Sequence, residues 1–136
     1  MDLERFVVAQ EDTYARALAE LRAGRKTSHW MWWVFPQVAG LGTSGTSQAY
    51  AIADLAEARA YLRHDVLRPR LLECCRALLD LEDVGAERVL GSVDAMKLRS
   101  SMTLFAHADP DQPVFRGVLG KYYDGAEDER TVALLG

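Results

Sequence analysis

Residues 28–37, SHWMWWVFPQ, constrain the fold more than any other stretch, because they hold all three tryptophans of the chain. Their apolar side chains would occupy both faces of a strand and all sides of a helix, so the hydrophobic period does not decide between the two. No other segment alternates well enough to supply a partner strand, and a lone strand leaves its backbone groups unpaired. We therefore predict a short helix, capped by Thr27 or Ser28 and ended by Pro36, that the other helices enclose.

The remaining segments follow the spacing of amphipathic helices. We predict helices at residues 3–21, with a break near 10–13, and at 48–52, 55–62, 66–81, 86–90, 95–108, 114–123 and 129–135. Helix ends are predicted at Gly24 and at N-capping aspartates, at positions 12, 54, 65, 94 and 128. Three glycines and four hydroxyl residues predict a loop at 40–47. The expected fold is all-α, a compact single domain over residues 1–136 with about seven or eight short helices around the Trp-rich helix.

The charge balance narrows the classes of partner. Sixteen basic and 20 acidic residues are spread along the 136 positions and give a formal net charge of −4, so the broad basic surface of a nucleic-acid-binding protein is absent. The first residues lack a signal-peptide pattern, and no apolar run approaches the roughly 20 residues that span a bilayer. We expect a cytoplasmic protein with neither a nucleic-acid nor a membrane partner. Adjacent Cys74 and Cys75 are expected to be buried reduced thiols.

Two groups of residues are candidates for catalysis. His29 opens the Trp-rich helix beside Ser28, where its imidazole would serve as a general acid or base; the alternative is a local hydrogen bond beneath the tryptophans. Lys97 shares a helix face with Ser100 and Ser101, as a base and its nucleophile would. The alternative there is an ordinary polar edge, with Lys97 paired to Asp94 and the serines bonded to backbone carbonyls. The three histidines show no metal-ligand spacing, so we expect no metal and no cofactor.

An anion site is suggested by Arg25, Lys26 and the loop at 40–47. Glycine-rich backbone amides and hydroxyl groups bind phosphate when a cation stands nearby. Residues 40–45, GLGTSG, have the formal GxGxxG spacing, but the dinucleotide fingerprint needs a strand before it and a helix after it inside a strand-helix-strand unit. An all-helical chain does not provide that context.

Three stretches together resemble one known family. They are residues 24–37, GRKTSHWMWWVFPQ, the Gly40-Leu41-Gly42 turn, and residues 97–105, KLRSSMTLF. These look like the domain of unknown function 1810 family, and the resemblance extends over essentially the whole chain. It implies a small, mainly helical bacterial protein and brings no established activity. Leu90-Gly91 stands where that family usually has Phe-Gly, a departure that concerns packing more than chemistry.

The expected function is a small-molecule site beside the Trp-rich helix. Its ligand would be a nucleotide or another phosphate-bearing compound, because polar side chains there adjoin aromatic rings on which a base can stack. The expected catalytic candidates are His29, Lys97 and Ser101. The expected ligand-binding residues are Arg25, Lys26, His29, Trp30, Trp32, Gln37, Ser44, Ser47, Tyr50, Lys97, Ser100 and Ser101. The alternative is a noncatalytic helical adaptor whose aromatic segment is only core and whose surface binds another protein.

Overall fold

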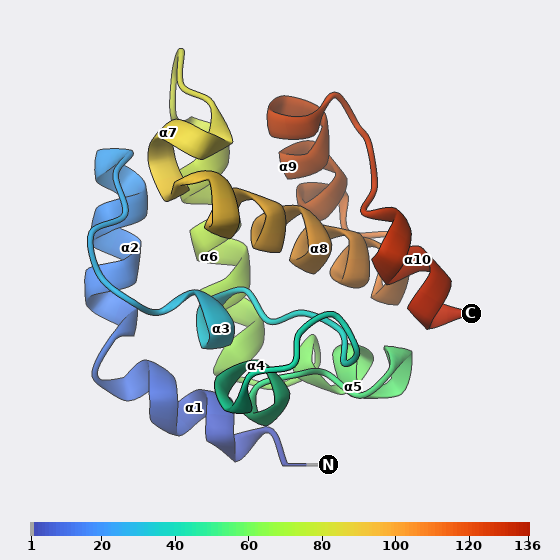
Figure 1. Ribbon diagram of the computed structural model, residues 1–136. Coiled ribbons are helices and arrows are strands. Elements are labelled where there is room, and N and C mark those ends of the chain that lie inside the picture. The colour runs from blue at the N-terminus through green and yellow to red at the C-terminus, as the bar shows by residue number, and fades with distance from the viewer. Residues whose placement is uncertain (1) are drawn as a thin grey trace.

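A computed structural model describes residues 2–136 and confirms the all-α fold (Figure 1). Ten helices are present in this range, because the first segment divides in two and the helical turn predicted at 48–52 forms earlier, at Gly45–Ala49. In chain order they are α1 (Glu4–Glu11), α2 (Tyr14–Ala23), α3 (Met31–Val34), α4 (Gly45–Ala49), α5 (Leu55–Tyr61), α6 (Leu67–Asp80), α7 (Ala86–Leu90), α8 (Ser92–Ala108), α9 (Pro113–Tyr123) and α10 (Glu129–Leu135).

Helix α8 forms the centre of the packing. It contacts α5, α7, α9 and α10, while α6 lies between α2 and α9. Residues 100–106 of α8 are all buried, as expected of a helix with neighbours on several sides. One continuous hydrophobic cluster joins Phe6 near the N-terminus to Leu119 in α9. The elements therefore share a single core.

The Trp-rich segment is helical over only four residues, Met31–Val34. Trp30 and Phe35, on either side of α3, are buried, but Trp32 and Trp33 are only half-buried. The helix is shorter than predicted because the residues before it are held in a non-helical conformation by Glu20 of α2. The Glu20 carboxylate accepts hydrogen bonds from the backbone amides of Thr27 (2.8 Å) and Ser28 (3.0 Å), so neither residue caps α3.

Helix starts agree with the predicted caps at two positions and differ at others. The carboxylates of Asp54 and Asp128 accept from backbone amides three residues ahead, at 2.9 and 3.0 Å, which confirms both caps. The prediction for Asp65 is wrong, because the Nδ1 atom of His64 accepts from the first amides of α6 instead. Asp12 ends α1 and does not cap α2. Gly24 ends α2 in the left-handed conformation, as predicted.

The Gly-rich loop is shorter than predicted, because α4 begins at Gly45. Ser44 is its N-cap: the Ser44 hydroxyl accepts from the amide of Ser47 at 3.1 Å. Helix α8 likewise begins earlier than predicted, at Ser92, so Asp94 lies inside its first turn and is free to bind lysines. Both differences change where polar side chains lie: Ser44 caps α4, and Asp94 lies in the first turn of α8.

Two extended segments meet beside α4. Val38 and Ile52 form a parallel β-bridge, and the Ile52 amide donates to the Gln37 carbonyl at 2.8 Å. The Ala39 amide donates to the Ile52 carbonyl, also at 2.8 Å. These bonds hold the chain after the Trp-rich segment in one position and so fix where the Gln37 side chain begins.

Two further observations concern membrane-spanning helices and the cysteines of the described residues. None of the helices in residues 2–136 is long and apolar enough to cross a membrane. Cys74 and Cys75 are both free and fully buried, and burial raises the pKa of the Cys74 thiol to about 12. The two thiols are therefore packing groups in the core, not exposed nucleophiles.

Candidate functional site

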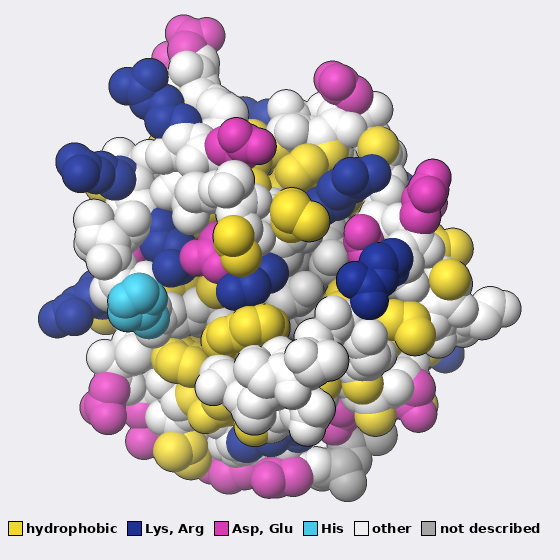
Figure 2. Space-filling model, viewed as in Figure 1, with side chains coloured by type: hydrophobic (Ala, Val, Ile, Leu, Met, Phe, Trp, Pro, Cys, Tyr) yellow, Lys and Arg dark blue, Asp and Glu magenta, His cyan; other side chains and the backbone are white. Residues whose placement is uncertain are grey.

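A cavity of about 350 Å³ lies between the chain at residues 32–51 and the helices α8 and α10. Figure 2 shows hydrophobic and basic side chains gathered in the middle of the same face of the molecule. The size falls at the lower end of the range of small-molecule sites. Its lining consists of Trp32, Gln37, Val38, Ala39, Gly40, Leu41, Gly42, Ser47, Gln48, Tyr50, Ala51, Val93, Met96, Lys97, Arg99, Ser100, Asp128 and Arg130.

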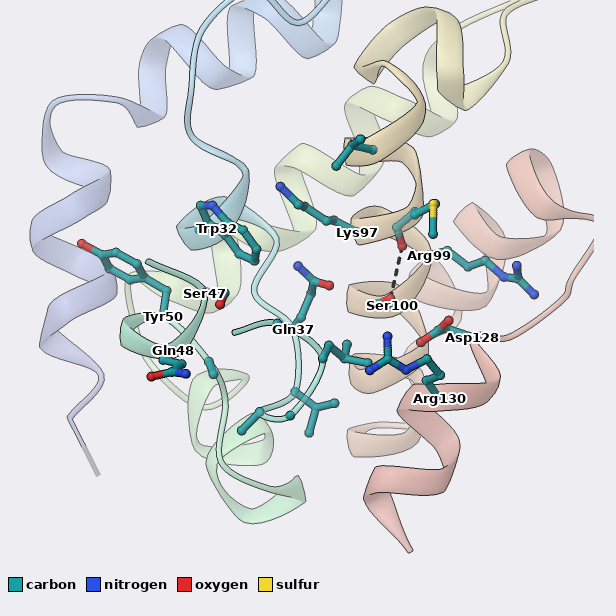
Figure 3. A pocket seen from close by; sticks show the side chains of 18 residues that line it. Trp32, Gln37, Ser47, Gln48, Tyr50, Lys97, Arg99, Ser100, Asp128 and Arg130 are labelled. Carbon is teal, nitrogen blue, oxygen red and sulfur yellow. Dashed lines mark hydrogen bonds between the residues drawn. The ribbon is translucent and has the colours of Figure 1, made fainter. Parts of the chain in front are cut away.

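Gln37 stands in the middle of this cavity. Figure 3 shows its side chain with Trp32 and Ser47 on one side and Lys97 and Ser100 on the other. The residue is only 9% exposed, and its Nε2 atom is buried without a hydrogen-bond partner within residues 2–136. A buried amide nitrogen without an acceptor is uncommon in native proteins, and a bound ligand is one of its ordinary explanations.

The Gly40-Leu41-Gly42 turn forms one wall. The backbone amides of these three residues have no hydrogen-bond acceptor within the described part of the chain. At Gly42 a Cβ atom would lie 2.7 Å from the hydroxyl of Ser47, so only glycine lets the turn pack this closely on α4. The tight packing and the unpaired amides together give this wall hydrogen-bond donors suited to an anion.

Lys97 forms the opposite wall and is held by two contacts. Its Nζ atom lies 3.1 Å from Asp94 and 4.0 Å from the centre of the Trp32 ring, within cation–π range. Asp94 also binds Lys26 at 2.9 Å. Burial raises the pKa of the Asp94 carboxyl, but hydrogen bonds and charge from the two lysines outweigh burial and lower it. The two lysines and one carboxylate leave a net positive charge beside Trp32.

Arg99 of α8 and Arg130 of α10 are the other two cations of the lining. Arg99 is engaged, since its guanidinium donates to the carbonyls of Ala126 (3.0 Å) and Glu127 (2.7 Å). Arg130 forms no ion pair within residues 2–136, and Figure 3 shows its side chain turned toward Gln37 while that of Arg99 turns away. Asp128 is the one acidic residue of the lining. Three basic side chains against one acidic one make the cavity locally positive in a chain of net charge −4.

The rim of the cavity is partly apolar. Val93 and Met96, on the first turns of α8, are 64% and 72% exposed. Both line the cavity, next to Lys97. Exposed apolar side chains around a polar, positive interior suit a ligand that has both an uncharged and an anionic part.

The structure brings together half of the ligand-binding residues expected from the sequence. Those that line the cavity are Trp32, Gln37, Ser47, Tyr50, Lys97 and Ser100. Two others lie next to it: Lys26 reaches it through Asp94, and Ser44 caps α4 beneath Ser47. The rest lie elsewhere, as Arg25 and His29 are exposed outside the lining and Trp30 and Ser101 are buried in the core.

The catalytic arrangement expected from the sequence is not formed. Ser101 is fully buried and its hydroxyl has no partner in residues 2–136, while Ser100 donates to the Met96 carbonyl at 3.2 Å. Lys97 is paired with Asp94, so neither serine has a base beside it. Lys97 and Ser101 lie one turn apart on the same side of α8, but Lys97 is at the cavity and Ser101 is buried in the core. His29 is exposed and lies outside the cavity.

Several lining residues were missed by sequence reasoning. Val93 comes from a turn of α8 that begins before the predicted helix, and Met96 lies within that helix but was expected to be an ordinary apolar position. Arg99, Asp128 and Arg130 depend on where α10 packs. The capping motif at Asp128 marks the start of α10 but not its position against α8. No group of three or more histidines, cysteines or carboxylates within the described residues is arranged to hold a metal ion.

Comparison with known proteins decides the family. The pattern of the family described as "Protein of unknown function (DUF1810)" matches residues 1–135. The chain belongs to this DUF1810 family. The match also covers all the stretches that carry the resemblance, from the Gly24 turn to α8.

A solved relative has the same fold. The crystal structure of the conserved hypothetical protein Rv1873 from Mycobacterium tuberculosis matches with a TM-score of 0.97 and 52% sequence identity, over 98% of this chain and 96% of that one. No curated protein matches the chain. The two proteins therefore share one fold over nearly their whole length, and the DUF1810 description assigns no activity.

Proposed function

We propose that this DUF1810 protein binds a phosphate-bearing small molecule, a nucleotide or a related compound, in the cavity between the Gly40 turn and α8. The observation that carries the proposal is a set of unused donors around one cavity. They are the Gln37 amide, the Arg130 guanidinium and the backbone amides of residues 40–42. The Gln37 amide is buried, and a buried donor without an acceptor destabilises a protein unless something binds it. Arg130, Gly40 and Gly42 are exposed, so a ligand can reach them.

The lining suggests which part of the cavity holds which part of the ligand. Arg130 and the amides of the Gly40-Leu41-Gly42 turn supply positive charge and N–H groups for the phosphate. Trp32 presents an indole surface, one face of which is covered by Lys97 at 4.0 Å. Lys97 is placed to exchange its contact with Asp94 for one with the ligand, because Lys26 remains to neutralise that carboxylate.

The proposal includes a cytoplasmic location, which suits two reduced cysteines. It involves no cofactor, nucleic acid or membrane. It also places Lys97 in ligand binding and not in catalysis, since Lys97 is paired with Asp94 and the Ser100 hydroxyl donates to the Met96 carbonyl.

A thermal-shift screen tests the proposal. Inorganic phosphate, nucleotides, sugar phosphates and NAD-derived compounds should be compared, because a ligand at one hundred times its Kd stabilises the native state by about 2.7 kcal/mol. We expect at least one phosphate compound to raise the Tm. Replacing Arg130 by Ala should weaken that binding about ten- to a hundredfold, while Arg88→Ala, an exposed arginine on α7, should not change it. No shift with any compound would instead favour a noncatalytic adaptor that binds another protein.

A further inference from the structure

Two buried side-chain atoms within residues 2–136 have no hydrogen-bond partner, Gln37 Nε2 and Ser101 Oγ. Ser101 lies deep in α8 with no exposed surface and takes no part in the cavity, whereas Gln37 lines it. An unpaired amide costs more than an unpaired hydroxyl, because the amide carries two donors and an acceptor and loses more hydration. The position of Gln37 therefore calls for a partner that comes from outside the chain.

The backbone at Gln37 is held in place. Pro36 precedes Gln37, and the Gln37 carbonyl accepts a hydrogen bond from the Ile52 amide at 2.8 Å. Val38, which follows Gln37, forms the β-bridge to Ile52. The side chain therefore starts from a fixed point of the cavity wall, and Figure 3 shows its amide group near both Trp32 and Lys97. Because the backbone is already ordered, only the side chain of Gln37 has to lose conformational entropy when a ligand binds.

We infer that the Gln37 amide recognises the edge of a planar ring, so that the ligand is a nucleotide and not a sugar phosphate. The inference rests on the proposed function and adds the identity of the uncharged part. Every nucleobase presents hydrogen-bond acceptors on its edge, and glutamine amides pair with such edges. Trp32 in the same cavity offers the aromatic surface that a flat ring prefers.

The apolar side chains near Gln37 favour a base over a sugar. Val38 and Leu41 line the cavity beside the amide, and Val93 and Met96 complete the rim. A ring with a few polar edge atoms fills such a space at little cost. The hydroxyl groups of a sugar would lose hydration against these side chains without enough partners to replace it.

The first test uses the protein without ligand. In Gln37→Leu the unpaired amide is replaced by an apolar group of similar size, so the Tm should stay the same or rise, as it does when a group kept for binding is removed. Ser101→Ala is the matched control, because it removes the other unpaired atom at a place outside the cavity. A Tm that falls by several degrees in Gln37→Leu would show that the amide has a structural partner and would overturn the inference.

The second test measures affinity by calorimetry with matched ligands. Adenosine 5′-monophosphate and uridine 5′-monophosphate are compared with ribose 5-phosphate, which has the same phosphate and sugar but no base. We expect at least one nucleotide to bind tenfold more tightly than ribose 5-phosphate, and Gln37→Leu to remove about tenfold of that preference, the loss of one hydrogen bond. Ser101→Ala should keep the preference.

The outcomes separate this inference from the proposed function. Equal affinity for the nucleotides and ribose 5-phosphate would overturn the base-reading role and leave a phosphate site. A nucleotide preference that Gln37→Leu leaves unchanged would also overturn it, because some other group would then read the base. Binding of none of the three compounds would overturn the proposed function and this inference with it.

Discussion

Glu20 is the residue on which the geometry of the Trp-rich segment depends most directly. It is 9% exposed, and besides two backbone amides its carboxylate accepts from the Ser28 hydroxyl at 2.6 Å and the Trp30 indole at 2.9 Å. Burial acts to raise its pKa, but the hydrogen bonds from Ser28, Thr27 and Trp30 prevail and lower it to about 2. The ionised carboxylate is therefore the form that the fold stabilises.

Acid should weaken the protein through Glu20. The pKa of Glu20 is lower in the folded state than its ordinary value of 4.5. The ionised carboxylate therefore adds its full share to the free energy of unfolding above pH 4.5, and this share is lost as the pH falls toward 2. Glu20→Gln should lower the free energy of unfolding by about 2 kcal/mol at pH 7, since the amide places a donor among donors. Urea unfolding at several pH values measures this. A difference between the two proteins that does not shrink between pH 5 and pH 2 would contradict the assignment.

Gly42 should not tolerate a side chain. A Cβ there would approach the Ser47 Cβ to 2.8 Å as well as its hydroxyl, so Gly42→Ala should destabilise the protein by about 1–3 kcal/mol and move the Gly40 turn away from α4. Gly45→Ala is the control, because a Cβ at Gly45 meets nothing within 4 Å. Thermal unfolding compares the two. An equally small loss in both variants would show that the turn packs more loosely than the structure indicates.

Helix α10 is attached to the rest of the molecule largely by polar contacts at its start. Asp128 caps it by accepting from the Thr131 amide (3.0 Å) and hydroxyl (2.5 Å), and the Asp128 amide itself donates to Thr103 of α8 at 2.9 Å. Just before it, Glu127 contacts His107. The cap thus controls both the start of the helix and the position of Arg130 in the cavity.

Removing this cap should loosen α10 while the rest of the fold stays intact. Asp128→Ala should cost about 1 kcal/mol and speed amide hydrogen exchange in residues 129–135, with exchange in α6 unchanged. Asp54→Ala, which removes the equivalent cap of α5, serves as the comparison, since its effect should stay within α5. Faster exchange throughout the Asp128→Ala protein would mean that α10 belongs to the cooperative core.

The sequence predicts elements well where local chemistry determines them. Helices α5, α6, α9 and α10 follow from an apolar period, and α5 and α10 from an aspartate cap as well. The starts of α3, α4 and α8 are less predictable because their determinants are either distant or ambiguous in sequence. Glu20, far back in α2, sets the conformation before α3, and Ser44 is one of four hydroxyl residues in its loop that have the chemistry of a cap.

At the scale of the whole molecule, the site is assembled from three segments that are far apart in the sequence. Gln37 and the Gly40 turn face Lys97 of α8 and Arg130 of α10. The sequence indicates Lys97 and the polar residues on either side of the Trp-rich segment, because their local composition is unusual. It does not reveal Arg130 or exclude Ser101, since both depend on how α8 and α10 pack.

One core implies one unfolding transition. The hydrophobic cluster extends from Phe6 to Leu119, and all three tryptophans lie at residues 30–33, with Trp30 inside the cluster and Trp33 packed against it. Tryptophan fluorescence therefore reports on one corner of the chain, whereas far-ultraviolet circular dichroism reports on all the helices. For a single domain the two signals should give the same urea midpoint. Loosening of α10 by Asp128→Ala should leave the two midpoints together, because α10 lies at the edge of the packing. A fluorescence transition that precedes the loss of helix by more than the experimental error would instead mean that α1 to α4 unfold as a separate unit, and that the cavity lies between two units which bind its ligand jointly.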